Sequence, residues 1–381
     1  MAIDYRPANV FFYPRIRLSP YFEATQRHGA RAYSVYNHMY LPSWYGDTEG
    51  EYWALTNDVV IWDVAVERQL EIKGPDAFAF TNMLTPRDLT RCKVGQCMYV
   101  MITDENGGII NDPVLTRLDE NHFWLSLSDS DVLLWAKGLA NDSNWKVELG
   151  EPDVAPMQVQ GSKSRQVMRA LFGDRILDLA YYHHFEATLD GMEMVVTRTG
   201  YTGEFGYEIY LRNATRDGVR LWDTVMEAGR PFNIRPTGPS LIRRLEAGIR
   251  NYGQDMRLEH NPYEVGLGRT VDLDQEADFI GKEALKRINA GGIKRKLVGV
   301  EIHGDRIEGW NEDYWPVHRH GQPVGQVTTA AYSPRLRQNI GYAMIPVEHA
   351  GLGTEVAVDV RGVETPATVV KEPFVESKVL G

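Results

Sequence analysis

Alternating polar and apolar positions in the first part of the chain predict strands and helices in close succession. Residues 68–73 alternate as a half-buried strand does, and the turn residues after them lead into a helical apolar pattern over residues 77–84. The same order returns with a predicted strand at residues 123–127 and an amphipathic helix at residues 132–140, which follows a run of capping side chains. The pattern therefore predicts a mixed fold of helices and strands.

Further along, a predicted pair of strands is followed by a helix. Residues 192–198 and 207–211 have the composition of strands and are separated by a glycine-rich turn. Residues 239–252 carry four apolar side chains on one face at helical spacing, namely Leu241, Ile242, Leu245 and Ile249. We therefore expect one helix over this whole segment.

The composition changes at residues 289–296, where paired glycines and a basic run follow a helical pattern. Beyond this point, four short apolar segments alternate with turn residues, as in a small barrel or sandwich: residues 297–302, 324–327, 339–343 and 355–360. We therefore expect two regions, at residues 1–288 and 289–381.

Composition and charge exclude several classes of protein. Of the 381 residues, 43% are hydrophobic and 24% are charged, which excludes a wholly disordered chain. The longest apolar stretches, such as residues 132–136, are far shorter than the roughly 20 residues that span a bilayer. The N-terminus lacks the basic start and apolar run of a secretory signal, so we expect a cytoplasmic protein without a membrane partner. A net charge of −11 argues against a nucleic-acid partner.

The cysteines and histidines predict no metal site. The only two cysteines, Cys92 and Cys97, cannot supply four zinc ligands and lack the two-residue spacing of redox motifs, so we expect plain reduced thiols. The paired histidines at residues 183–184 and 318–320 have no nearby carboxylate or cysteine ligands in the sequence. We expect these histidines to be structural or exposed.

A first candidate site lies in residues 104–113, where two adjacent glycines precede two isoleucines and then Asn111 and Asp112. The glycines permit a tight turn, and the isoleucines anchor the chain so that the two polar residues emerge at a fixed point. Asp112 there can hold a proton or orient an amine. The alternative is a plain hairpin whose polar side chains satisfy local backbone groups.

A second candidate site lies in residues 198–209, where every third residue is glycine from position 200 to position 206. The segment leads into a strand, unlike the dinucleotide fingerprint, which leads into a helix. Glycines beside Tyr201 and Glu208 can let a flat heteroaromatic ring lie against the backbone while the carboxylate accepts its hydrogen bonds. The alternative is a glycine-rich hairpin with a buried tyrosine. A weaker third signal is Glu67, which can simply pair with Arg68.

These segments, in this order, resemble the folate-dependent family of the glycine-cleavage T-protein. The match extends over most of the chain and is carried by residues 105–110 with Asp112, residues 198–204, 244–247, 252–256, 261–267 and 278–285. The resemblance implies an α+β fold, with three sub-domains in a ring around a central tetrahydrofolate site. Residues 1–288 would form two interleaved α/β sub-domains that bind folate, and residues 289–381 would form the small terminal β-barrel.

Within that family, the dimethylsulfoniopropionate demethylases show the greatest likeness. It is carried by residues 36–39, 61–69, 85–87, 111–113 and 128–134. Two T-protein motifs are altered, since residues 63–67 are Asp-Val-Ala-Val-Glu and residues 238–241 are Gly-Pro-Ser-Leu, without the arginine of the second motif. The glycine-rich hairpin keeps a T-protein-like sequence and departs from the demethylase pattern. The donor is therefore expected to be dimethylsulfoniopropionate or a related onium or methoxy compound.

The resemblance implies transfer of a methyl group from a small donor to N5 of tetrahydrofolate. Asp112 would be the catalytic residue, Asn111 and Tyr36 would bind the donor, and the folate would lie against Tyr99, Tyr201, Glu208 and Glu67. Two alternatives stay open, namely aminomethyl transfer from a lipoyl-carrier protein, as in glycine cleavage, and folate binding without turnover. We expect a monomer or a homodimer.

Overall fold

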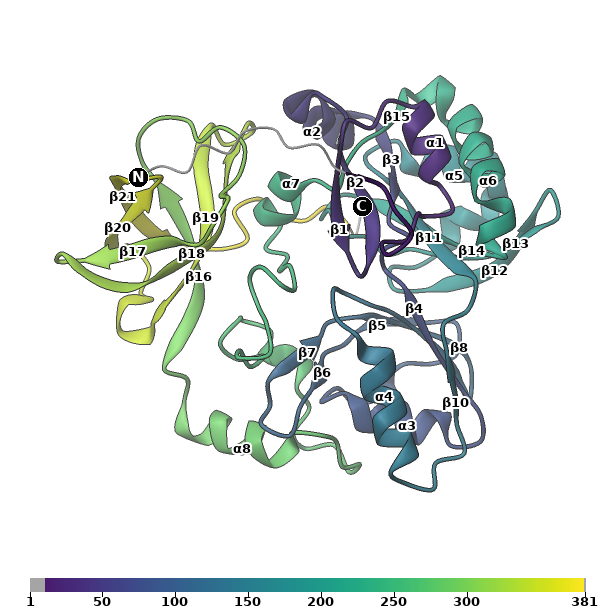
Figure 1. Cartoon of the computed structure of the whole chain (residues 1–381), viewed down its shortest axis with the longest axis horizontal. Helices are drawn as coiled ribbons and strands as arrows, with labels where there is room; N and C mark the ends of the chain where they lie inside the picture. The colour runs from purple at the N-terminus through teal and green to yellow at the C-terminus, as the bar shows by residue number, and fades with distance from the viewer. Residues whose placement is uncertain (1–10, 380–381) are drawn as a thin grey trace.

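The computed structural model describes residues 11–379 and consists of three lobes arranged around a central segment that contains α7 (Leu241–Glu246). Figure 1 shows a lobe built on a six-stranded sheet, a lobe built on a five-stranded sheet, and a terminal barrel. This arrangement confirms the predicted α+β fold with three sub-domains in a ring.

The six-stranded sheet has the order β12-β13-β14-β11-β3-β15. All neighbouring strands are antiparallel except β3 and β15. Its strands are β12 (His184–Leu189), β13 (Met192–Thr197), β14 (Gly206–Arg212), β11 (Val154–Gln160), β3 (Val59–Asp63) and β15 (Ile234–Pro236). Helices α5 (Ser164–Phe172) and α6 (Ala214–Gly229) pack on the sheet, and α1 (Phe22–Arg27) packs on α6.

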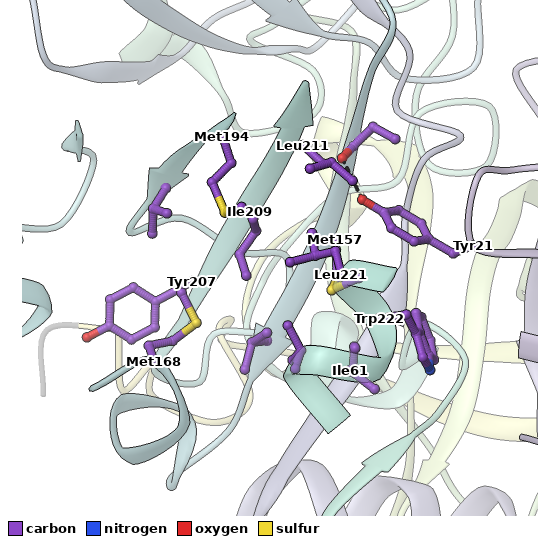
Figure 2. Packing of buried hydrophobic residues seen from close by; sticks show 14 of the residues in the cluster. Tyr21, Ile61, Met157, Met168, Met194, Tyr207, Ile209, Leu211, Leu221 and Trp222 are labelled. Carbon is purple, nitrogen blue, oxygen red and sulfur yellow. Dashed lines mark hydrogen bonds between the residues drawn. The ribbon is translucent and has the colours of Figure 1, made fainter. Parts of the chain in front are cut away.

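A large apolar core holds this sheet and its helices together. Figure 2 shows Trp222 and Leu221 of α6 in one cluster with labelled side chains of β3, β11 and β14. The hydroxyl of Tyr21 donates to the backbone oxygen of Ala155 at 2.8 Å. Strands β11 and β14 are buried along almost their whole length. They therefore give the cavity described below a rigid wall.

The five-stranded sheet has the order β10-β4-β9-β8-β5 and is antiparallel. Its strands are β10 (Glu148–Gly150), β4 (Gln69–Lys73), β9 (His122–Ser126), β8 (Val114–Asp119) and β5 (Cys97–Tyr99). Helices α3 (Ala77–Leu84) and α4 (Val132–Asn141) lie in the same lobe. Because Leu70 and Ile72 of β4 are buried while Lys73 is exposed, this strand follows the alternation seen in the sequence.

The C-terminal lobe is a closed barrel with the strand order β16-β19-β18-β17-β20-β21. Its strands are β16 (Arg295–Ile302), β19 (Gln338–Pro346), β18 (Gln322–Ser333), β17 (Trp315–Arg319), β20 (Glu355–Val360) and β21 (Val363–Val370). The closed sheet decides between the two expected forms, barrel and sandwich. The expected division after residue 288 falls inside α8 (Lys282–Gly291), and the domain boundary stays a prediction.

Shorter elements connect the lobes and shape the centre. They are the hairpins β1–β2 (Ala32–Tyr36 and Met39–Trp44) and β6–β7 (Ile102–Thr103 and Ile109–Asn111), α2 (Thr48–Asn57), and five 3-10 turns at Leu89–Arg91, Asp174–Asp178, Arg230–Phe232, Gly268–Thr270 and Val347–His349. The helix expected over residues 239–252 is shorter than predicted. It begins after Ser240, whose hydroxyl caps Arg243 N–H, and ends before Gly248, which has a φ of +78°.

Candidate active site

A cavity of about 520 Å³ lies between the two N-terminal lobes and the central segment. Its walls come from the six-stranded sheet, the loop after β9, the β1–β2 hairpin, the residues around α7 and the C-terminal tail. Six of the seven residues expected at the site line this cavity: Tyr36, Glu67, Tyr99, Asp112, Tyr201 and Glu208.

Asp112 lies directly after β7 and is 9% exposed. Its Oδ2 accepts a hydrogen bond from the hydroxyl of Tyr99 at 2.8 Å, and its Oδ1 accepts one from the hydroxyl of Ser128. Burial raises the pKa of Asp112 to about 7, because the two hydroxyl donors only partly offset the loss of water around the carboxylate. Asp112 can therefore gain or lose a proton near neutral pH, as a general base must.

Three tyrosines from separate parts of the chain surround Asp112. Tyr36 ends β1, Tyr99 ends β5, and Tyr201 lies in the glycine-rich turn between β13 and β14. Burial raises the pKa of each of these tyrosines, so their hydroxyls stay protonated and act as donors near neutral pH. Tyr201 donates to the backbone oxygen of Arg250 at 3.0 Å, which ties the turn to the central segment.

Glu208 lies in the middle of β14, opposite Gln158 of β11 in the sheet register. Its carboxylate accepts hydrogen bonds from Thr199, from Tyr210 at 2.9 Å and from Gln158 Nε2 at 2.5 Å. Burial raises its pKa, although these donors oppose that effect. The other amide atom of Gln158, Oε1, is buried and has no hydrogen-bond partner among residues 11–379. The wall therefore presents two acceptors, a carboxylate and a free amide oxygen, to N–H groups of a bound ring.

Glu67 lies in the loop between β3 and β4 and is half-buried beside the cavity. The hydroxyl of Ser126 donates to it at 3.3 Å, and burial together with the nearby Glu208 raises its pKa. The expected alternative, pairing with Arg68, is wrong. Arg68 pairs with Glu151 instead.

Asn111 is the expected site residue that does not line the cavity. It is fully buried behind the wall, and its side chain bonds to Ser128, Ser130 and the N–H of Asp112. Direct contact with a donor stays a prediction for Asn111, and its position favours a supporting role for Asp112.

Several cavity residues were not singled out in the sequence. Gln158 lies on a strand whose mostly apolar sequence gives no sign of a binding role, and the pair Tyr181 and Tyr182 precedes β12 with no motif around it. In the C-terminal tail, Ser377 and Val379 line the cavity, and the backbone N–H of Lys378 donates to the backbone oxygen of Gly203 in the glycine-rich turn at 2.7 Å.

The structure also describes the two cysteines and the residue types that could bind a metal ion or cross a membrane. Cys92 and Cys97 are buried and free. Across residues 11–379, no three histidine, cysteine or acidic side chains gather in a way that could hold a metal ion. In the same part of the chain, no helix has the length and apolar character needed to cross a bilayer.

Known proteins match both the sequence and the shape of this chain. The family model for the GCVT N-terminal domain matches residues 21–275, and the model for the glycine cleavage T-protein C-terminal barrel domain matches residues 295–376. The dimethylsulfoniopropionate demethylase DmdA of Ruegeria pomeroyi is 36% identical over 362 residues, which cover 95% of this chain and 98% of that protein. An aminomethyltransferase of Symbiobacterium thermophilum is 33% identical over 373 residues, with the same two coverages of 95% and 98%.

A solved structure supports the fold. The crystal structure of the glycine cleavage system aminomethyltransferase T from Bartonella henselae matches with a TM-score of 0.86 and 23% identity, over 96% of this chain and 100% of that one. Both family models, the long relatives and the shared ring of lobes lead to one conclusion: the chain belongs to the glycine cleavage T-protein family.

Proposed function

We propose that this chain is a tetrahydrofolate-dependent demethylase, which transfers a methyl group from a small donor to N5 of tetrahydrofolate. The donor is dimethylsulfoniopropionate or a related onium or methoxy compound. The observation that carries the proposal is the buried Asp112 carboxyl group, held by two hydroxyls at the wall of a cavity of about 520 Å³, where burial raises its pKa to about 7. The relative named as a dimethylsulfoniopropionate demethylase supports this choice of reaction.

The cavity wall fits a pterin ring. A pterin presents an amino group and ring N–H groups along one edge, and these need acceptors when they leave water. Glu208 and the unpartnered Oε1 of Gln158 are two such acceptors, adjacent on neighbouring strands. Glu67, beside Glu208 on the same wall, is a third polar group for the ring or for its substituents.

Tetrahydrofolate, when bound, supplies the nucleophilic amine N5. The protein's residues then position the donor, exclude water and manage one proton. A sulfonium methyl group needs no general acid, because the donor leaves as a neutral thioether once its carbon–sulfur bond breaks. As the new nitrogen–carbon bond forms, N5 would lose the proton of its N–H bond, and Asp112 would accept that proton. Tyr36 and its neighbouring rings can face a cationic donor through their π-systems.

The test is a product assay with purified protein and tetrahydrofolate. Dimethylsulfoniopropionate, glycine betaine and a methoxylated aromatic compound are added separately, and 5-methyltetrahydrofolate is measured by mass spectrometry, with Asp112→Asn as the matched variant. We expect 5-methyltetrahydrofolate to form with at least one donor, and little of it to form with Asp112→Asn. Methylenetetrahydrofolate and ammonia, formed only with an aminomethylated lipoyl-carrier protein, would instead establish aminomethyl transfer. Absence of any product, together with folate binding, would leave a binding protein.

The cytoplasmic location, the state as monomer or homodimer and the domain division at residue 288 belong to the same proposal. They follow from the sequence and the resemblance. Size-exclusion chromatography with light scattering tests the oligomeric state, with one or two copies of the chain as the expected result.

A further inference from the structure

The buried amide of Asn111 joins two segments that are far apart in the sequence. Its Nδ2 donates to the backbone oxygen of Ser128 at 2.9 Å and to the hydroxyl of Ser130 at 2.8 Å. Its Oδ1 accepts the backbone N–H groups of Ser128 and Asp112, both at 3.0 Å. An asparagine side chain has two donor and two acceptor positions, so the whole capacity of this amide is used inside the protein. Asn111 therefore fixes the backbone of Ser128 beside that of Asp112.

The β1–β2 hairpin holds the same segment from the other side. Asn37, at 2% exposure, donates through Nδ2 to the backbone oxygens of Leu127 at 3.1 Å and Ser128 at 2.9 Å. Its backbone N–H donates to Asp129 at 2.7 Å. Tyr36, which lines the cavity, directly precedes Asn37 in the chain. The backbone of Ser128 is thus held between the hairpin and the strand that leads to Asp112.

Held in this way, the Ser128 hydroxyl donates to Oδ1 of Asp112 while Tyr99 donates to Oδ2. One hydroxyl on each oxygen fixes the plane of the carboxyl group and leaves further acceptor positions on both oxygens free. We propose that Ser128, anchored by Asn111 and Asn37, is a positioning residue that orients Asp112 toward the reacting atoms and stabilises its carboxylate form. This inference rests on the proposed function, because Ser128 acts through the proton acceptor of that reaction.

The other groups around Asp112 determine which titration the experiment would report. The acidic neighbours are Glu67 and Asp255, and Asp255 pairs with Arg244. The remaining titratable neighbours are the tyrosines Tyr36, Tyr99, Tyr201 and Tyr252. Burial raises the pKa of all four tyrosines, so they stay protonated between pH 5 and 9. Burial also raises the pKa of Glu67 and of the adjacent Glu208, so these two carboxyls are the neighbours whose titration can overlap with that of Asp112. Glu67→Gln and Glu208→Gln separate them from it.

The test compares Ser128→Ala with Ser128→Thr, which keeps a hydroxyl. Loss of the donor destabilises the carboxylate form, so the pKa of Asp112 rises. The midpoint of kcat/KM against pH then moves upward by about one pH unit, and the rate at pH 7 falls about fivefold. Ser128→Thr is expected to keep the midpoint near that of the wild type, and Glu67→Gln to leave the shift in place.

Ser130→Ala serves as the matched control, because it removes a hydroxyl from the same segment that bonds to Asn111 and to the backbone oxygen of Ile110 rather than to Asp112. It is expected to lower the melting temperature without moving the midpoint. The inference is overturned if Ser128→Ala leaves the midpoint unchanged, or if Ser130→Ala moves it equally.

A second readout separates this inference from the proposed function. Calorimetry in two buffers of different ionisation enthalpy counts the protons exchanged when tetrahydrofolate binds, and it needs no turnover. Ser128→Ala is expected to shift the pH of half-maximal proton exchange upward by about one unit. If no donor is demethylated but this shift is seen, the proposed function fails and the role of Ser128 stands. If methyl transfer occurs without either shift, the role of Ser128 fails alone.

Discussion

Two buried aspartates close to the centre of the molecule have opposite surroundings. Asp255 is fully buried and is paired with Arg244 of α7, and it also accepts hydrogen bonds from Thr328 at 2.7 Å, Thr329 at 2.5 Å and the backbone N–H of Asn251 at 2.9 Å. Asp112 has two hydroxyl donors, and no cation among residues 11–379 pairs with it.

The difference separates a structural carboxylate from a reactive one. Asp255 joins α7 to β18 of the barrel, and its cation and donors together compensate for its burial. Asp112 is buried and has no counter-ion in the described part of the chain, so its pKa rises to about 7 and its proton can move at neutral pH. The same residue type thus stabilises the junction between lobes at one position and is available for chemistry at the other.

Replacing each aspartate by asparagine removes the charge at both positions and separates their two roles. Asp112→Asn is expected to lower kcat by about 10²- to 10⁴-fold, because the variant cannot accept the proton. The dissociation constant for tetrahydrofolate should change by less than about threefold, since Glu208 and Gln158 remain. Steady-state kinetics and calorimetry measure the two effects, and an equal loss in both would contradict the assigned role.

Asp255→Asn is expected to act on stability. The variant leaves Arg244 buried without its counter-ion, and the free energy of unfolding should fall by about 3–5 kcal/mol. Urea denaturation followed by circular dichroism measures this change. A loss below about 1 kcal/mol would show that Asp255 does not hold the lobes together.

The stability of the protein should also depend on pH through Asp112. Its pKa is about 7 in the folded state against an ordinary value near 3.8, so the folded state binds more protons than the unfolded state between these values. The contribution of Asp112 to stability therefore falls as pH rises from about 4 to 7 and is constant above. Asp112→Asn removes this loss and should raise the free energy of unfolding at pH 8 by about 1–3 kcal/mol. A variant less stable than the wild type at pH 8 would argue against the raised pKa.

The smallest predicted effect comes from removing one of the hydroxyls that donate to Asp255. Thr328→Val keeps the shape of the side chain but deletes one donor to this carboxylate, and it should cost about 1.5 kcal/mol of unfolding free energy. The midpoint of the pH–rate profile should not move, in contrast to the shift expected for Ser128→Ala. A shift of this midpoint would mean that the hydrogen bonds of Asp255 affect the titration of Asp112.

Local sequence patterns predicted the elements whose contacts lie close in the chain. The alternation before α3 correctly located β4 and that helix, and β9 and α4 also lie where the sequence predicts them, because burial of one face determines such elements. The run at residues 128–131 does not cap α4 as expected: the N-cap residue Asp131 makes no side-chain capping bond, and Ser128 and Ser130 bond to Asp112 and Asn111 instead. The hairpin before Asp112 was predicted from its two adjacent glycines, because glycine permits a tight turn. The helix at α7 was predicted too long, since its apolar periodicity continues past the left-handed Gly248 that ends it.

The remaining site residues depend on contacts that no local pattern encodes. Ser128 reaches Asp112 only because β8 and β9 turn the chain back, and Gln158 faces Glu208 only through the register of β11 and β14. Ser377 and Val379 follow the barrel in the chain, and they line the cavity only because the C-terminal tail returns to it. The roles of Asp112 and Glu208 are indicated by the local pattern as well as by the family resemblance, and that of Tyr99 by the resemblance alone, whereas their burial and partners come from the structure.

The most direct test of Asp112 as the proton acceptor is the pH dependence of methyl transfer. The rate of 5-methyltetrahydrofolate formation, as kcat/KM for the donor that proves active, is measured from pH 5 to 9. We expect kcat/KM to rise with pH, with a midpoint near 7, where the buried Asp112 loses its proton and becomes able to accept another. A rate that is already constant above pH 5 would contradict it, because Asp112 would then be an ordinary carboxylate that is ionised throughout.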